Sequence, residues 1–402
     1  MISIEEALHI VEANIPERRV VDIDLREAQG LHLAQDIRAP ESSPRYTGSS
    51  MDGYALRFAD CRGASADNPV FLKIVGESQA GIPFVGEVNA GCATRISTGA
   101  MLPVGCDTVL RVEDSREDGD RLAVLYAPTL SQDVRLAGEE FAVGEVLLRQ
   151  GAALQARELA LLAAVGVGRV TVFAMPRVAI LVTGTELARH DEAVIQPHQI
   201  RDSNSLMLAA AARQSGGEVI ARERVADSPD ATRAAIAQAN AAGVEIILCS
   251  GGVSVGRHDH VKEAALAEGF SQLFWKVRQK PGKPLFVCRK NNTLLFGLPG
   301  NPVSAYMCFC KYVAPALAHL AGRRRDERLV TGVADGRFTN DDNRTHLTRV
   351  RLTWRESQPP LVSQLDRQGA HMLTGLVMAD GFVTLEPGCE IASGAMLEVH
   401  LL

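Results

Sequence analysis

The chain has 402 residues, of which 46% are hydrophobic and 22% charged, and this balance predicts a folded protein with room for two to four domains. Its net charge of −6 disfavours a broad nucleic-acid-binding surface, so we expect no nucleic-acid partner. The sequence has no apolar run of about 18 residues and no basic-then-apolar leader. We therefore expect no membrane span, no membrane partner and a cytoplasmic location. The eight cysteines include no CxxC pair, which is typical of reduced thiols.

The N-terminal part combines helix-like patterns with short alternating segments. Residues 3–15, "SIEEALHIVEANI", predict a helix, and Ser3 followed by Glu6 fits a capping box. Residues 53–135 hold short alternating runs between Gly and Pro turns, a pattern typical of β structure. A second helix is predicted at 155–165. We therefore expect this half of the chain to be rich in β structure.

Residues 176–322 change character, because apolar strands there alternate with helices. This alternation predicts a mostly parallel sheet with helices on both faces. The predicted strands span 177–183, 218–225, 244–249, 285–289 and 292–297. Residues 326–402 return to short alternating segments, which predict a small β domain.

Polar stretches follow several of these strands, at the edge of an open α/β sheet where ligands bind. They are "TGTEL" (183–187), "VADSPD" (225–230), "SGGVSVGRHDH" (250–260) and "GLPGNPVS" (297–304). A further stretch, "KVRQKPGKP" (276–284), carries three lysines and an arginine around a Pro-Gly turn. We expect these segments to hold the binding residues.

The stretch at 250–260 places glycines and hydroxyls directly after a buried strand. Glycine lets backbone N–H groups approach a ligand closely, and a helix N-terminus favours an anion. The segment could equally be a tight strand-to-helix turn with Asp259 as its N-cap. It is not a Walker A loop, because Arg257 follows Gly256. The candidate substrate-binding residues are Ser250, Gly251, Gly252, Ser254 and Gly256, together with Thr183 and Gly184 from "TGTEL".

Two Pro-Gly stretches offer groups that suit an oxyanion. In "GLPGNPVS", the second proline suits the first position of a helix, whose free N–H groups point outward. In "QKPGKP", lysines on a stiffened turn suit phosphate or another oxyanion. Both stretches could instead be structural, as helix punctuation and a solvated hairpin. The candidates are Pro299, Gly300, Asn301, Pro302 and Ser304 in the first stretch, and Lys280, Pro281, Gly282 and Lys283 in the second.

Three carboxylates, Glu186, Asp227 and Asp259, follow strands of the same predicted sheet. Carboxylate oxygens near an oxyanion pocket suit a hard cation, so these residues are candidate ligands for Mg²⁺ at a phosphate. Asp227 has an alternative role, because either it or Ser228 could cap the helix that follows.

Two loops of the N-terminal half carry no specific chemistry by themselves. They are "SSMDGYA" (49–55) and "TRISTGAMLPVGCDTV" (94–109). The sequence also contains neither HExxH nor GxSxG, which argues against a zinc protease and a serine hydrolase.

Taken together, eight motifs in register over nearly the whole chain resemble one family, the molybdopterin molybdenumtransferases, which comprise the bacterial MoeA proteins and the E domain of gephyrin. The motifs are "SSMDGYA", "TRISTGAMLPVGCDTVLRVED", "RLAGEE" with "GEVLLRQGAAL", "RVAILVTGTEL", "QIRDSNSLML", "SGGVSVGRHDH", "KPGKPL" and "GLPGNPVSA". Each motif alone is moderately specific, whereas eight in order are highly specific.

The resemblance implies a multidomain protein of α/β and β domains. It implies an elongated connector domain at 1–45 and 136–175, an inserted β-rich domain at 46–135, a molybdopterin-binding α/β domain at 176–325 and a C-terminal β barrel at 326–402. It also implies a homodimer, in which the inserted domain of one subunit faces the α/β domain of the other.

The resemblance further implies that the chain inserts molybdate into adenylated molybdopterin and releases AMP, with Mg²⁺ as cofactor. Thr185 stands where the family usually has Asp, which removes one carboxylate from the expected pocket. Glu140 also replaces an Asp but keeps the charge. The functional positions carried over from the family are Asp52, Thr98, Glu186, Asp227, Asp259, Lys276, Lys280, Lys283, Pro299 and Pro302.

Two other functions stay open at this point. The α/β domain also resembles that of the molybdopterin adenylyltransferases, so the chain could perform or assist the preceding adenylation. It could also be a non-catalytic molybdopterin-binding scaffold, because Thr185 replaces a carboxylate. The molybdopterin adenylyltransferase and other cofactor-biosynthesis proteins are candidate partners. The choice between molybdate and tungstate also stays open, because these tetrahedral dianions differ little in size.

Overall fold

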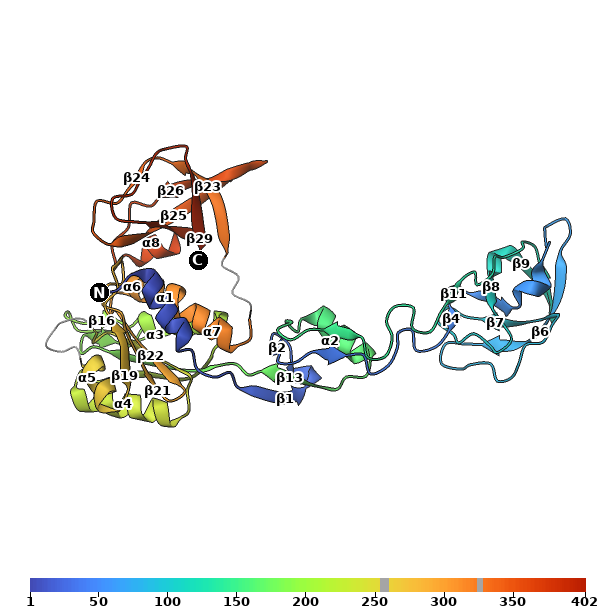
Figure 1. The fold of residues 1–402 in the computed structure, drawn as a ribbon, viewed down its shortest axis with the longest axis horizontal. Helices are drawn as coiled ribbons and strands as arrows, with labels where there is room; N and C mark the ends of the chain where they lie inside the picture. Colours follow the sequence, from blue (N-terminus) through green and yellow to red (C-terminus); the bar gives the residue numbers. More distant parts are fainter. Residues whose placement is uncertain (254–259, 324–327) are drawn as a thin grey trace. The chain divides into compact units, whose positions relative to one another are not determined.

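The computed structural model describes residues 1–253, 260–323 and 328–402. The chain forms two compact units (Figure 1). The first unit consists of residues 1–34, 151–154 and 170–402, and the second of residues 35–150 and 155–169. The division into four domains is finer than these two units and stays a prediction.

The first unit is built around a six-stranded sheet with the strand order β17-β14-β18-β22-β21-β19. The first four of these strands pair in parallel, which confirms the predicted mostly parallel sheet. The last two pair antiparallel, because residues 291–292 form a connection between β21 and β22 that is too short for a parallel crossover. The strands are β14 (Arg177–Thr183), β17 (Glu218–Val225), β18 (Ile246–Ser250), β19 (Ser271–Trp275), β21 (Phe286–Lys290) and β22 (Thr293–Leu298).

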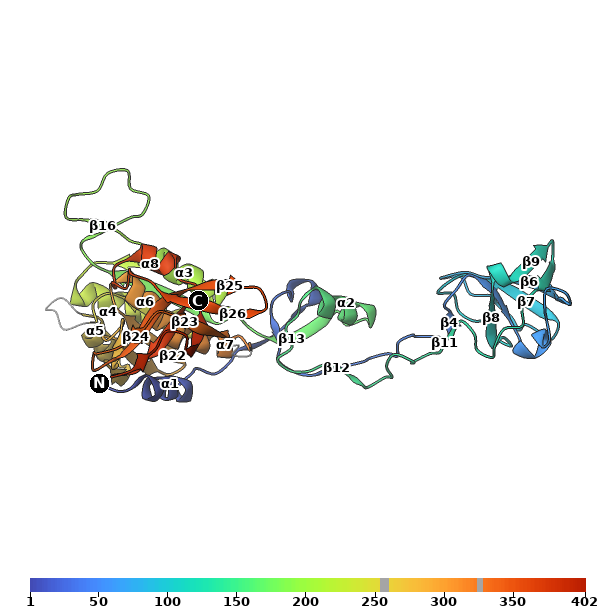
Figure 2. The ribbon, with the colours of Figure 1, turned by 90° about the horizontal axis from the view of Figure 1, so that it is seen from above.

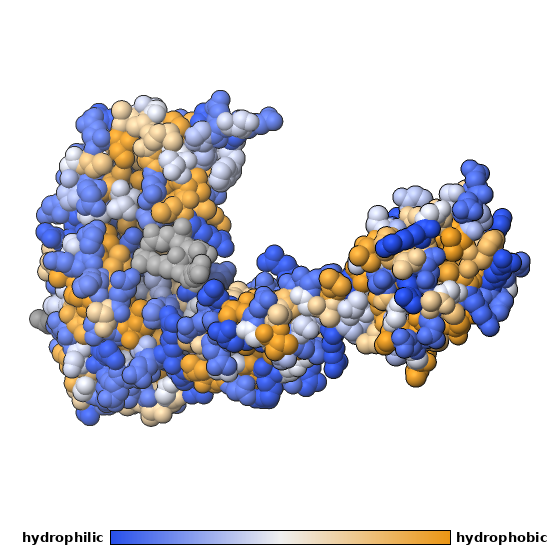
Figure 3. Space-filling view, turned by 45° about the vertical axis from the view of Figure 1, so that its right-hand side comes forward, coloured by the Kyte–Doolittle hydropathy of each residue, from blue (hydrophilic) through white to orange (hydrophobic). Residues whose placement is uncertain are grey.

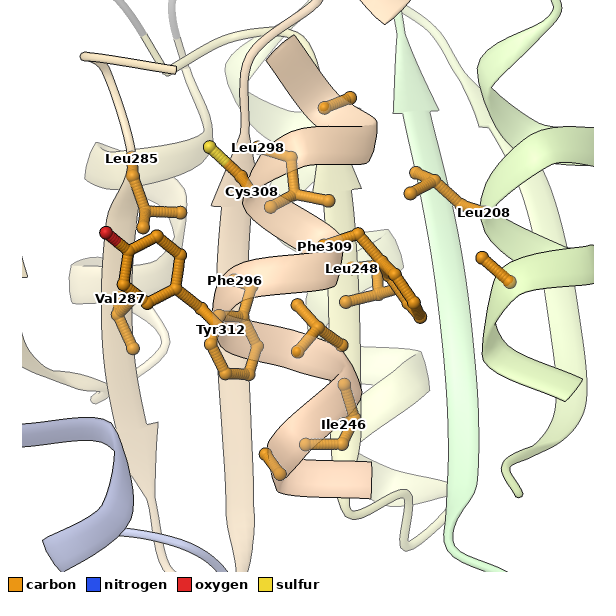
Figure 4. Close-up of a cluster of buried hydrophobic side chains, with 14 of the residues drawn as sticks. Leu208, Ile246, Leu248, Leu285, Val287, Phe296, Leu298, Cys308, Phe309 and Tyr312 are labelled. Carbon is orange, nitrogen blue, oxygen red and sulfur yellow. The ribbon is translucent and has the colours of Figure 1, made fainter. Parts of the chain in front are cut away.

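Helices cover both faces of this sheet (Figure 1). The core on one face includes residues of α1, α3, α6 and α7, and part of it is drawn in Figure 4. The core on the other face includes residues of α4 and α5. A π-helical segment, Phe309–Val313, joins α6 to α7. The helices are α1 (Ile4–Ala13), α3 (Asn204–Gln214), α4 (Pro229–Ala241), α5 (Val261–Ala267), α6 (Pro302–Cys308) and α7 (Ala314–Leu320).

The predicted capping box at the start of α1 is confirmed. The Ser3 hydroxyl accepts a hydrogen bond from the Glu6 backbone N–H at 3.1 Å, and the Glu6 carboxylate accepts one from the Ser3 backbone N–H at 2.7 Å. These bonds satisfy two N–H groups that a helix N-terminus otherwise leaves without partners.

The C-terminal part of the first unit is a small β barrel, as predicted. Its strands follow the order β26-β23-β29-β27, and β25 closes the barrel by pairing with both β26 and β27. Closure gives each of these five strands a neighbour on both sides. β20 (Gln279–Lys280) adds to the barrel by pairing in parallel with β25. The barrel elements are β23 (Leu329–Asp335), β25 (Thr345–Arg355), β26 (Gln358–Gln364), β27 (Gly381–Leu385) and β29 (Met396–Leu401), with β24 (Phe338–Thr339), β28 (Glu390–Ile391) and α8 (Leu373–Val377) beside them.

The second unit is dominated by a six-stranded sheet of order β8-β5-β7-β6-β10-β9, which confirms the predicted β-rich character. Its strands are β5 (Gly53–Leu56), β6 (Val70–Ser78), β7 (Cys92–Ile96), β8 (Thr108–Arg111), β9 (Ser115–Asp118) and β10 (Arg121–Val124). The same unit contains β3 (Ile37–Arg38), β4 (Gly48–Ser49), β11 (Val134–Arg135), β12 (Val146–Leu148) and α2 (Ala156–Ala164). A small sheet of β1 (Val20–Asp24), β13 (Arg169–Phe173) and β2 (His32–Leu33) lies mainly in the first unit.

The segment between β15 (Leu187–Ala188) and β16 (Ile200–Arg201) forms a loop that projects from the first unit (Figure 2). Hydrophobic residues are interspersed with hydrophilic ones over the face drawn in Figure 3. Within the described residues, every helix is too short or too polar to cross a membrane.

Candidate functional site

A cavity of about 600 Å³ lies at the carboxyl edge of the parallel strands in the first unit. The residues that follow β14, β17, β18 and β22 meet there, because the ends of parallel strands share one edge of a sheet. The predicted site residues in its wall are Thr183, Gly184, Glu186, Asp227, Ser250, Gly251, Gly252, Pro299, Gly300, Asn301 and Pro302. Three further predicted residues, Ser254, Gly256 and Asp259, lie outside the described residues.

The turn after β18 requires glycine for two reasons. Gly251 and Gly252 have φ values of 91° and 68°, in a region that L side chains rarely adopt. A Cβ on Gly251 would also lie 2.7 Å from the Thr183 carbonyl oxygen, which belongs to the neighbouring strand. The turn therefore brings backbone without side chains to the cavity wall, and the Gly251 N–H donates to the Leu298 carbonyl oxygen of β22 at 3.2 Å.

Two carboxylates of the predicted metal set, Glu186 and Asp227, lie in the cavity wall. The N-cap of α4 is Ser228, whose hydroxyl accepts a hydrogen bond from the Ala231 N–H at 3.3 Å. Asp227 is therefore not needed as the cap, which settles the alternative role considered from the sequence. Within the described residues, no three His, Cys, Asp or Glu side chains cluster closely enough to hold a metal ion. The three-carboxylate metal site stays a prediction, because Asp259 is not among those residues.

Asn204 was not predicted, yet it links three elements at the cavity. Its Nδ2 donates to the Ser250 hydroxyl at 2.8 Å and to the Gly300 carbonyl oxygen at 2.7 Å. A carbonyl oxygen can only accept, so this second bond fixes which end of the amide faces Gly300. The Asn204 side chain is buried, and its Oδ1 has no hydrogen-bond partner in the described part of the chain. The wall therefore contains a buried acceptor that a donor on a ligand could satisfy.

Sequence reasoning missed four other polar residues of the wall, Arg201, Asp202, Ser203 and His371. The first three precede α3, and their polar run "RDSN" before a predicted helix was a usable signal. His371 comes from the barrel region, where the Ala370 carbonyl oxygen accepts a hydrogen bond from the Val303 N–H at 3.1 Å. That contact joins segments far apart in the sequence, so no local pattern could have revealed it.

The predicted lysines lie on or before the turn of residues 279–284, called the lysine turn below. Pro284 of this turn lies in the cavity wall, whereas Lys280 and Lys283 are exposed and outside it. Ser304 is buried in the first turn of α6 and is not a wall residue. The Lys276 Nζ lies 3.9 Å from the ring centroid of Trp275, a cation–π contact.

Lys280 belongs to a cluster of charged residues around Asp342. The Lys280 Nζ lies 3.7 Å from Asp342 Oδ2, which also contacts Arg344 Nη2 at 2.6 Å and His346 Nε2 at 3.3 Å. The hydrogen bond from Arg344 is the main reason that the pKa of Asp342 lies well below its usual range, and His346 adds to it. Asp342 therefore stays ionised and holds basic side chains beside the lysine turn.

In the second unit, the predicted residues Asp52 and Thr98 contact each other. The Thr98 backbone N–H and hydroxyl donate to Asp52 Oδ1 at 2.7 and 3.0 Å. Asp52 precedes β5 and Thr98 follows β7, and these strands pair antiparallel with Gly53 opposite Ile96. Gly53 must be glycine, because a Cβ would lie 2.0 Å from the Leu110 carbonyl oxygen. The two motifs therefore form one local structure.

Comparison with known proteins covers the chain almost completely. Residues 2–166 match the model "MoeA N-terminal region (domain I and II)", residues 179–319 match "Probable molybdopterin binding domain", and residues 331–402 match "MoeA C-terminal region (domain IV)".

Two relatives and one solved structure illustrate the likeness. A "Molybdopterin molybdenumtransferase" from Nostoc sp. is 38% identical over 75% of this chain and 69% of its own length. "Molybdopterin molybdenumtransferase 2" from Mycobacterium tuberculosis is 33% identical over 99% of both chains. The solved structure of a "molybdopterin biosynthesis moea protein" from Pyrococcus horikosii superimposes with a TM-score of 0.87 at 28% identity, covering 100% of this chain and 99% of that one. The resemblance seen in the sequence motifs is thereby confirmed, and the chain belongs to the MoeA family of molybdopterin molybdenumtransferases.

Proposed function

We infer that the chain is a molybdopterin molybdenumtransferase that acts in the biosynthesis of the molybdenum cofactor. The observation that carries this function is the cavity at the carboxyl edge of the sheet, within the region that matches the molybdopterin-binding model. Relatives that match nearly the whole chain bear the transferase name, which favours this function over an adenylyltransferase or a scaffold.

The proposed substrate is adenylated molybdopterin, a pterin linked to a nucleotide through phosphates. The cavity volume of about 600 Å³ lies within the usual range for a small-molecule site. The bare backbone at Gly251 and Gly252 suits close contact with phosphate oxygens. The unpaired Asn204 Oδ1 suits an N–H or O–H group, and pterin, adenine and ribose all carry such donors.

Mg²⁺ is the proposed cofactor. It is commonly held by one or two protein carboxylates together with substrate phosphates, and Glu186 and Asp227 supply two carboxylates in the wall. These residues therefore fit the ion, and Asp259 is the third proposed ligand. The bound ion would neutralise phosphate charge, while the glycine turn and Asn204 orient the substrate.

Molybdate is the proposed co-substrate, and the lysine turn is its proposed contact. Molybdate carries two negative charges and cannot enter a dry pocket without positive partners. Lys283 directly precedes Pro284, which lies in the cavity wall, and Lys280 lies on the same turn. Their contribution is charge neutralisation and positioning, since the reaction needs no protein nucleophile.

The proposed assembly is a homodimer in which Asp52 and Thr98 of one subunit complete the cavity of the other. Mixing Asp52→Ala protein with Asp227→Ala protein should then restore up to about one intact site per heterodimer. Turnover of isolated heterodimers measures this. Inactive heterodimers would point to a site built within one chain.

Release of AMP from adenylated molybdopterin tests the proposed function. We expect AMP and a molybdenum-loaded pterin in equal amounts, with release dependent on molybdate and Mg²⁺. Consumption of ATP by the chain would identify an adenylyltransferase instead. Tight pterin binding without any AMP release would identify a scaffold.

A further inference from the structure

Beneath the lysine turn lies a network of three fully buried polar side chains, Gln279, Cys308 and Tyr312. The Gln279 Nε2 donates to the Gly282 carbonyl oxygen at 3.3 Å and to the Cys308 Sγ at 3.4 Å. The Tyr312 hydroxyl donates to the Gln279 Oε1. Both the oxygen and the nitrogen of the Gln279 amide therefore have hydrogen-bond partners, and the nitrogen binds the backbone of the turn.

This network lies within an otherwise apolar core. Figure 4 shows Tyr312 and Cys308 on the same helical stretch, with Tyr312 beside Leu285 and Val287. Burying an amide and a hydroxyl costs free energy that apolar side chains of similar size avoid. Burial raises the pKa of both Tyr312 and Cys308, so both groups stay protonated and remain donors at neutral pH. Core stability alone therefore does not explain these residues.

The backbone of Gly282, in the middle of the turn, lies in close contact with the network. Gly282 has a φ of 95°, and a Cβ there would lie 2.5 Å from the Cys308 Sγ and 2.6 Å from the Gln279 Nε2. The Cys308 thiol adds a weaker contact to the Gly282 carbonyl oxygen at 3.6 Å. In the described part of the chain, the Gly282 carbonyl oxygen thus receives its side-chain hydrogen bonds from Gln279 and Cys308.

The ends of the turn are held separately. The Val277 N–H donates to the Lys283 carbonyl oxygen at 3.1 Å, and the Lys276 N–H donates to the Leu285 carbonyl oxygen at 2.9 Å. β20 pairs with β25 of the barrel on the other side. The ends of the turn are fixed by backbone hydrogen bonds. The network therefore sets the backbone conformation of the residues between Lys280 and Lys283.

We propose that Gln279, Tyr312 and Cys308 are positioning residues that hold the lysine turn in the arrangement that meets the oxyanion co-substrate. The inference rests on the proposed use of Lys280 and Lys283 for molybdate. A lysine side chain is long and flexible, so a fixed backbone beneath it lowers the ordering needed when the anion binds. The network touches no substrate and acts only through the turn.

The test compares Tyr312→Phe, Gln279→Leu and the double variant in the full-length protein. Three quantities are measured: the molybdate concentration for half-maximal AMP release, the affinity for AMP by calorimetry, and the urea midpoint of unfolding. Tyr306→Phe is the matched control, because Tyr306 lies on the same helical stretch but interacts with Cys310 rather than with the turn.

In Tyr312→Phe the amide oxygen is left buried and unpaired, so we expect a lower urea midpoint and a half-maximal molybdate concentration raised about three- to tenfold. AMP affinity should stay at the wild-type value. In the double variant both partners of that bond are gone, but the Gly282 carbonyl oxygen loses its Gln279 donor as well, so the urea midpoint should stay below the wild-type value. The molybdate requirement should stay raised, because the turn has still lost its support.

A wild-type molybdate requirement in the double variant, at a lowered urea midpoint, would show that the network is only structural and would overturn the inference. A similar rise in Tyr306→Phe would do the same. Wild-type values in Tyr312→Phe, combined with a raised requirement in Lys283→Ala, would overturn the role of the network alone. An unchanged requirement in Lys283→Ala would overturn the role of the turn itself.

Discussion

The cavity wall is built from strand ends, whereas the lysine turn next to it is built from contacts between distant segments. Thr183, Ser250 and Pro299 reach the wall because β14, β18 and β22 are parallel and end together. The lysine turn depends on the barrel strand β25 and on Tyr312 of the segment after α6. A single substitution at a strand end should therefore disrupt the backbone of the wall. Substitutions near the turn should instead displace the turn gradually and weaken its contact with the ligand.

The comparison also separates the charges. The wall contributes the carboxylates of Glu186 and Asp227, bare backbone and the guanidinium of Arg201, while the turn contributes ammonium groups on exposed side chains. We expect changes in the wall to affect nucleotide and metal binding, and changes in the turn to affect the use of molybdate. The following variants test this division, from the largest expected effect to the smallest.

Gly251→Ala should break the wall. The alanine would combine an unfavourable φ with a Cβ 2.7 Å from the Thr183 carbonyl oxygen, so we expect a loss of about 2–4 kcal/mol of stability. AMP binding should fall below detection. Gly243→Ala is the matched control, since its φ is 71° and its Cβ would make only an ordinary contact at 3.9 Å. Its cost should be about 1–2 kcal/mol, with AMP binding kept. Equal effects of the two substitutions on AMP binding would contradict the account.

Asp227→Asn should lower turnover by about tenfold or more, because an amide replaces a charged ligand at the phosphates without changing shape. The urea midpoint should stay close to the wild-type value. Asp230→Asn is the control, because Asp230 lies in the first turn of α4 and not in the cavity wall. If both variants have wild-type turnover at limiting Mg²⁺, Asp227 is not a metal ligand.

Ser228→Ala should show the opposite behaviour to Asp227→Asn. Removing the N-cap of α4 should cost about 1 kcal/mol of stability, while turnover stays near the wild-type value. Chemical unfolding and AMP release measure the two effects. Strong loss of turnover at unchanged stability would mean that Ser228, and not only Asp227, acts at the substrate.

The sequence could indicate a large part of the cavity wall, because the residues concerned follow strands that are recognisable in the sequence. A buried strand followed by glycine, serine or a carboxylate predicts a ligand edge whenever neighbouring strands are parallel. Gly251, Asp227 and Pro302 do line one cavity, while their roles in binding stay predictions. The antiparallel hairpin of β21 and β22 was not foreseen, because alternating apolar runs do not reveal strand direction.

The remaining features depend on partners far along the chain. The role of Asn204 rests on a carbonyl 96 residues later, and that of Gln279 on a hydroxyl 33 residues later. Neither hydrogen bond produces a hydrophobic periodicity or a motif that the sequence would reveal. Buried polar networks of this kind emerge only when the core is assembled, so they mark where sequence reasoning stops.

The most direct test of the division between wall and turn is the Lys283→Ala variant, assayed for AMP release over a range of molybdate concentrations and for AMP affinity by calorimetry. Losing one charge-assisted contact should raise the half-maximal molybdate concentration about ten- to hundredfold while AMP affinity stays unchanged. Lys283→Arg should restore only part of this loss, because a planar guanidinium does not reproduce a compact ammonium charge. An unchanged molybdate requirement with lost AMP affinity would contradict the account and would move Lys283 to the phosphate site.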